Sequence, residues 1–71
     1  MSLPRILKKI IEEEYITGSK IPKSVKSSID QLVAINALEL SILKRGTRYS
    51  IGNQEIFQSE ISARYPEGLE S

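Results

Sequence analysis

Cysteine and histidine are both absent from this 71-residue sequence. Without cysteine there is no disulfide bond and no thiolate metal site, and without histidine the usual zinc-binding sets are excluded too. The sequence also lacks a glycine-rich phosphate loop and any pairing of a nucleophile with a base. We therefore expect a protein that is not an enzyme and that needs neither a metal nor another cofactor.

Acidic residues gather at one point, Glu12-Glu13-Glu14, and such a cluster can suggest catalytic carboxylates. On one helix, however, Glu12 and Glu13 would point about 100° apart. No other acid or base is placed to join them. We interpret the cluster as a solvated helix face.

Long hydrophobic runs are missing as well. The longest falls far short of the roughly 20 residues of a membrane-spanning helix, and the N-terminal residues do not have the apolar core of a secretory signal. We expect neither a membrane partner nor a small-molecule substrate. Together with the lack of cysteine, these features favour an intracellular protein, in the cytoplasm or nucleoid or in a nucleus.

The residues that are present are those of an ordinary globular protein, and the length suits one small domain. Apolar residues at helical spacing predict a helix over residues 3–15, on which Leu3, Ile6 and Ile10 share one side. Residues 17–22 then form a connection. We expect Ile21 to anchor this connection in the core, within a short strand if one forms there.

A second helix is predicted over residues 22–37, because Val25, Ile29 and Leu32 repeat at helical spacing. Pro22 suits the first helical position. Asn36 suits a left-handed exit from the helix, after which the chain returns to the core.

Alternating residues predict a β-hairpin over residues 39–51, with a turn over residues 44–48 in which Gly46 supplies a positive φ. A weaker apolar stripe, which includes Phe57, predicts a third helix over residues 54–64. We accordingly divide the chain into a domain over residues 1–52 and a C-terminal helix and tail over residues 53–71.

Charge is distributed unevenly although the net charge is only +1. Residues 1–19 are neutral, residues 20–48 carry a net +4, and residues 49–71 carry a net −3. The middle of the chain is therefore basic, and the end of the chain is acidic. A coherent basic segment is typical of a protein that binds nucleic acid.

The segment Val-Lys-Ser-Ser-Ile-Asp-Gln-Leu-Val-Ala-Ile-Asn-Ala-Leu, residues 25–38, resembles the recognition-helix segment of linker-histone globular domains and of small winged-helix regulators. The resemblance covers roughly residues 3–51, and Asp30 and Gln31 depart from the basic residues often found in linker histones. A complete winged helix also has three helices before its hairpin, and only two are evident, so either residues 17–23 contain a further helical turn or the domain is trimmed. The matching positions are Val25, Lys26, Ser28, Ile29, Leu32, Val33, Leu38, Lys44 and Tyr49.

This resemblance implies a small winged helix-turn-helix domain of the α+β class, mainly α, that binds double-stranded DNA in transcriptional regulation or chromosome organisation. The helix over residues 22–37 would enter the major groove, and the basic hairpin would contact the backbone. The residues that we expect to contact nucleic acid are Lys20, Lys23, Lys26, Ser27, Gln31, Lys44, Arg45 and Arg48.

Two alternatives stay open at this point. The domain could be a protein–protein interaction module within a larger assembly, which the low net charge and the acidic tail favour. The C-terminal helix could also form a homodimer that places two recognition helices on adjacent half-sites.

Overall fold

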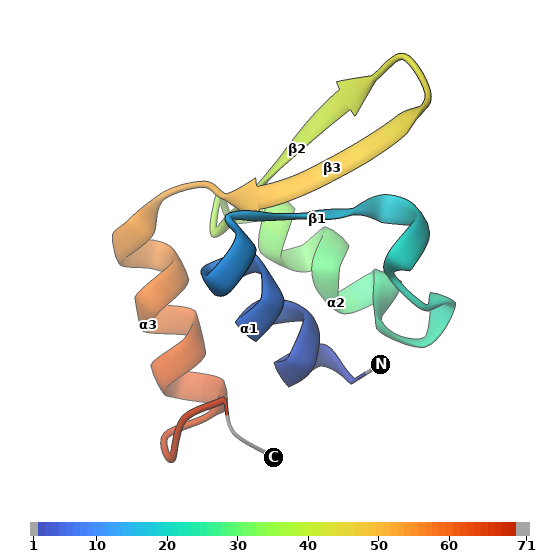
Figure 1. Cartoon of the computed structure of the whole chain (residues 1–71). Coiled ribbons are helices and arrows are strands. Elements are labelled where there is room, and N and C mark those ends of the chain that lie inside the picture. Colours follow the sequence, from blue (N-terminus) through green and yellow to red (C-terminus); the bar gives the residue numbers. More distant parts are fainter. Residues whose placement is uncertain (1, 70–71) are drawn as a thin grey trace.

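A computed structural model describes residues 2–69 and contains three α-helices, a short 3₁₀ helix and a three-stranded antiparallel sheet (Figure 1). The predicted α+β class, mainly α, is confirmed. The sheet has the strand order β1-β3-β2, so the last strand in sequence lies in the middle. In chain order the elements are α1 (Leu3–Glu13), β1 (Tyr15–Thr17), η1 (Gly18–Lys20), α2 (Lys23–Ala34), β2 (Leu38–Leu43), β3 (Gly46–Ile51) and α3 (Gln54–Arg64).

Helix α1 buries Ile6, Leu7 and Ile10, as its apolar spacing predicts. It ends earlier than residue 15, because Glu14 adopts a left-handed conformation with a φ of 73°. That bend lets Tyr15–Thr17 become strand β1, which pairs with β3. The β-forming character of these three residues therefore prevails over continuation of the helix.

The connection to α2 contains a single turn of 3₁₀ helix, η1, and the suggested strand around Ile21 is wrong. Ile21 is nevertheless buried, so its predicted role as an anchor is confirmed. The helical turn suggested within residues 17–23 is present, because η1 is such a turn, and it packs against β3.

Helix α2 is shorter at both ends than the predicted range of residues 22–37. Pro22 lies just before the helix with an extended ψ of 150°. At the other end, Asn36 has a φ of 68°, and the N–H groups of Asn36 and Ala37 donate to the carbonyls of Val33 and Leu32. This pair of hydrogen bonds is a Schellman motif. The predicted left-handed exit at Asn36 is thus confirmed.

The hairpin of β2 and β3 begins one residue earlier than predicted, at Leu38. Its turn consists of Lys44 and Arg45 alone, because Leu43 pairs with Gly46 and the following residues already belong to β3. The predicted five-residue turn over residues 44–48 is therefore wrong. Gly46 has the expected positive φ, at 148°.

Helix α3 matches its predicted range of residues 54–64. The Asn53 side chain caps it by accepting a hydrogen bond from the Ile56 N–H at 3.0 Å. Phe57 is the one residue of α3 in the buried core, and it lies there with residues from every other element except η1. The division at residue 52 stays a prediction. The complete buried set is Ile6, Leu7, Ile10, Ile16, Ile21, Ile29, Leu32, Ala37, Leu38, Tyr49 and Phe57.

Gly52 lies where two backbone segments come close together. A Cβ atom at this position would lie 2.6 Å from the Asn36 carbonyl oxygen and 3.1 Å from the Leu38 carbonyl carbon. Backbone atoms in hydrogen-bonded segments cannot move aside easily. The position therefore requires glycine.

We expect Gly52→Ala to lower the free energy of unfolding by about 2 kcal/mol, as in other overpacked sites. Gly18→Ala is a matched control, because its Cβ would clash with the Thr47 hydroxyl, which can rotate, whereas the backbone oxygen of Thr47 lies at an ordinary contact distance of 3.5 Å. Urea denaturation of both variants measures the difference. Equal losses of stability would contradict the proposed backbone clash.

Candidate nucleic-acid interface

Lys44 and Arg45 form the tip of the hairpin, which projects beyond the helices (Figure 1). Both residues are exposed, and neither takes part in the ion pairs found among residues 2–69. The two charges therefore remain available to an anionic partner. The prediction that the hairpin has a basic tip is confirmed for these two residues.

Lys20 and Lys23 are exposed on either side of the connection between η1 and α2. Helix η1 packs against β3, and Figure 1 shows this connection on the same side of the molecule as the hairpin, below its tip. Two segments far apart in the sequence thus place exposed cations on one side of the molecule.

Arg48 lies within β3 and not in the turn. Its side chain lies on the face of the sheet opposite to the buried Tyr49. There its guanidinium carbon lies 4.2 Å from the centroid of the Tyr15 ring. This distance is typical of a cation–π contact. Arg48 thus belongs to the outer face of the sheet, beside β1, and not to the hairpin tip.

Lys26 is occupied by contacts within the protein. Its Nζ atom lies 2.6 Å from Oδ1 of Asp30 and 5.5 Å from the centroid of the Tyr49 ring. The hydrogen bond with Asp30, and secondarily that with Tyr49, raises the pKa of Lys26. Asp30 therefore offsets the charge of Lys26, and the basic surface on α2 is weaker than a count of lysines indicates.

Ser27 and Gln31 are exposed on α2, as predicted. They lie four and eight residues after Lys23, so the three side chains share one exposed face of the helix. A polar face of this kind can reach base edges when a helix lies in the major groove. The face also carries Asp30, which would repel phosphate.

The acidic residues of the C-terminal part lie at the other end of the molecule. Helix α3 follows the end of β3 that is remote from the hairpin tip (Figure 1). Its Glu55 is exposed, and its Glu60 is paired with Arg64 at 3.6 Å. The uneven charge of the sequence thus becomes a separation of charge along the molecule.

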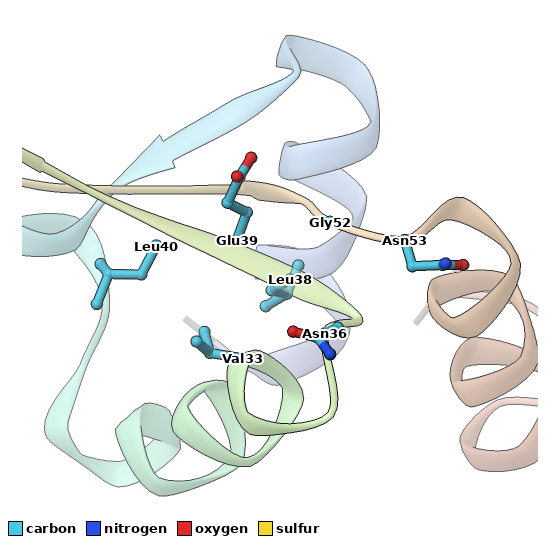
Figure 2. Close-up of a pocket in the computed structure, with 7 residues that line it drawn as sticks. All are labelled: Val33, Asn36, Leu38, Glu39, Leu40, Gly52 and Asn53. Carbon is cyan, nitrogen blue, oxygen red and sulfur yellow. The ribbon is translucent and has the colours of Figure 1, made fainter.

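A hollow of about 380 Å³ lies beside β2 and has both apolar and polar walls (Figure 2). Figure 2 shows it between β2 and the C-terminal end of α2. Sequence analysis did not find it, because its walls come from three separate segments. They are formed by Val33, Asn36, Leu38, Glu39, Leu40, Gly52 and Asn53.

No related protein was found, and neither a metal-binding nor a membrane-spanning element was found in the part of the chain that the structure describes. No protein-family model, no curated protein and no solved structure matches the chain. Residues 2–69 contain no group of three or more potential metal-ligating side chains. None of the helices in this part of the chain has the length and apolar character needed to cross a membrane.

The contact between Arg48 and Tyr15 can be measured by a double-mutant cycle. We expect Arg48→Met and Tyr15→Leu to show a coupling of about 0.5–1 kcal/mol in urea unfolding, because each change removes one partner of the cation–π contact. Arg45→Met combined with Tyr15→Leu is the control, since Arg45 lies in the turn. Indistinguishable couplings for the two pairs would contradict the contact.

Proposed function

We propose that this protein is a winged-helix DNA-binding domain in which α2 is the recognition helix and the β2–β3 hairpin is the wing. The order of the elements supports this proposal. A winged helix has three helices before its hairpin, and η1, which lies between β1 and α2, takes the place of the one that was not evident in the sequence. The sheet supports it too, since β1 joins the hairpin as a third strand. The proposed function is DNA binding, in transcriptional regulation or DNA organisation. We do not propose a catalytic function.

The single observation that carries the proposal is the placing of exposed cations on one side of the molecule. Lys20, Lys23, Lys44 and Arg45 are all exposed, and they come from two separate segments on the side of the hairpin (Figure 1). Contacts of these cations with a phosphate backbone would release counterions on binding. The acidic residues of α3 lie on the opposite side and would keep that side away from DNA.

Within this proposal, the residues have different roles. The exposed face of α2 with Ser27 and Gln31 would lie toward base edges, where a glutamine side chain suits adenine. Lys23, in the first turn of α2, would hold a phosphate together with the N-terminal N–H groups of the helix. Lys44 and Arg45 would contact the flanking backbone. Arg48 and Lys26 would contribute less, because Tyr15 and Asp30 already contact them.

Titration of a duplex DNA with the protein, followed by fluorescence anisotropy at several salt concentrations, tests the proposal. We expect affinity to fall steeply with salt. Replacement of both Lys44 and Arg45 by alanine should reduce the slope of log K against log salt by about 2, since each phosphate contact contributes about 0.9.

The matched control replaces Arg5 and Lys8 by alanine, because this pair is also exposed and carries the same charge on α1. Its slope should stay close to that of the unchanged protein. An affinity that does not respond to salt, or equal effects of the two double variants, would overturn the proposal.

A second function is favoured by a different observation. Leu40 and Ile42 of the hairpin are exposed, and Ile42 retains 83% of its accessible surface. Exposed apolar side chains are unusual on a surface that only contacts phosphates, and they suit a module that binds protein. Absence of DNA binding at low salt would select this function.

A further inference from the structure

Strand β2 forms an open edge of the sheet, because the strand order places only β3 beside it. Its backbone pairing can be followed from the N–H of Gly52, which donates to the Ala37 carbonyl at 3.1 Å. Residues whose backbone groups bond to the neighbouring strand alternate along an antiparallel pair. The backbone N–H and C=O groups of Glu39 and Ser41 therefore also face β3. The backbone groups of Leu38, Leu40 and Ile42 therefore face away from β3.

The side chains at this edge are apolar on one face. Leu40 lies opposite Tyr49 on the side of the sheet that covers the core, and Ile42 lies two residues further along, opposite Thr47. Leu40 is 39% exposed and Ile42 is 83% exposed. An edge strand with free backbone groups and exposed apolar side chains is a template for pairing with another strand.

The structure points to a second copy of this chain as the occupant: we propose that two copies pair antiparallel through β2, about a two-fold axis at Leu40. In this register Leu40 lies opposite Leu40 of the other copy, and Ile42 lies opposite Leu38. The result is a continuous six-stranded sheet with the helices of both copies on the same side. This surface is distinct from α3. It shares Lys44 with the proposed DNA contact, but the inference does not rest on DNA binding.

The apolar side chains that line the hollow beside β2 support this register. Leu38 and Leu40 line the hollow beside β2 together with Val33, as Figure 2 shows. Placing Ile42 opposite Leu38 of the other copy brings the most exposed apolar side chain to the apolar wall of that hollow. The same contact forms twice, since a two-fold interface is self-complementary.

Charge complementarity supports the register as well. Glu39 lies opposite the uncharged Ser41 of the other copy, so like charges do not face each other across the edge. Lys44 lies opposite Asn36, next to the C-terminal end of the other copy's α2. A cation is favourable there, because the helix dipole is negative at that end.

One strand edge and two apolar side chains per copy make a small contact. Stable complexes bury about 1,200 Å² or more. We therefore expect self-association that depends on concentration, with dimers dominant only in concentrated solution.

Single cysteine variants test the two-fold register directly, because the natural sequence has no cysteine. Leu40→Cys would place two thiols across the axis at a Cα separation of about 5.5 Å, which a disulfide can bridge. Leu43→Cys is the control, since Leu43 is on the same strand and equally exposed, at 43% against 39%. Its two copies would be about 20 Å apart at 3.4 Å per residue.

Under mild oxidation of the full chain, we expect a covalent dimer of Leu40→Cys to form at least tenfold faster than that of Leu43→Cys. Circular dichroism checks that both variants are folded. Equal rates would overturn the proposed register.

Sedimentation velocity over a range of concentrations tests the contact without cross-linking. Ile42→Lys should remove self-association, because a charge would enter the apolar part of the hollow. Ile11→Lys is the matched control on α1, where Ile11 is 45% exposed, and it should associate like the unchanged chain. A chain that stays monomeric at millimolar concentration, or an Ile42→Lys variant that still dimerises, would overturn the proposal.

Discussion

The close contact between the end of α2 and the end of β3 is the constraint on which the rest of the structure depends. The N–H groups of Gly52 and Asn53 donate to the carbonyls of Ala37 and Asn36, at 3.1 and 2.7 Å. These two bonds fix the direction in which the hairpin leaves α2. They also fix the start of α3, because Asn53 is its N-cap. The open edge of β2 and the hollow beside it are consequences of the same junction.

Sequence reasoning succeeded where local chemistry determines the conformation. The apolar spacing of α1 and α2, the left-handed exit at Asn36 and the positive φ of Gly46 all follow from the properties of single residues or of one helix face. The prediction of the turn was wrong because the pairing of β2 with β3 continues as far as Gly46. The length of such a turn is set by the register of the two strands. Strand β1 was missed because it forms only by pairing with β3, far along the chain.

The candidate site was predicted in part for the same reason. Exposure of Ser27, Gln31 and the tip cations follows from helix periodicity and from their place in a turn. The contacts of Arg48 with Tyr15 depend on the pairing of β1 with β3, which the sequence does not reveal. The pairing of Lys26 with Asp30 has the spacing of a helical ion pair, so this signal was present in the sequence. This ion pair lowers the net positive charge of α2, because Asp30 partly cancels the charge of Lys26.

The two strand pairs of the sheet differ greatly in the number of residues that separate their strands along the chain. A turn of only two residues connects β2 and β3, whereas β1 reaches β3 across the whole of η1, α2 and β2. Closing a short loop is fast, and closing a long one must overcome more chain entropy. Pairing of β2 with β3 therefore costs less chain entropy than pairing of β1 with β3. The central strand β3 is joined to one neighbour by a short turn and to the other only through η1, α2 and β2.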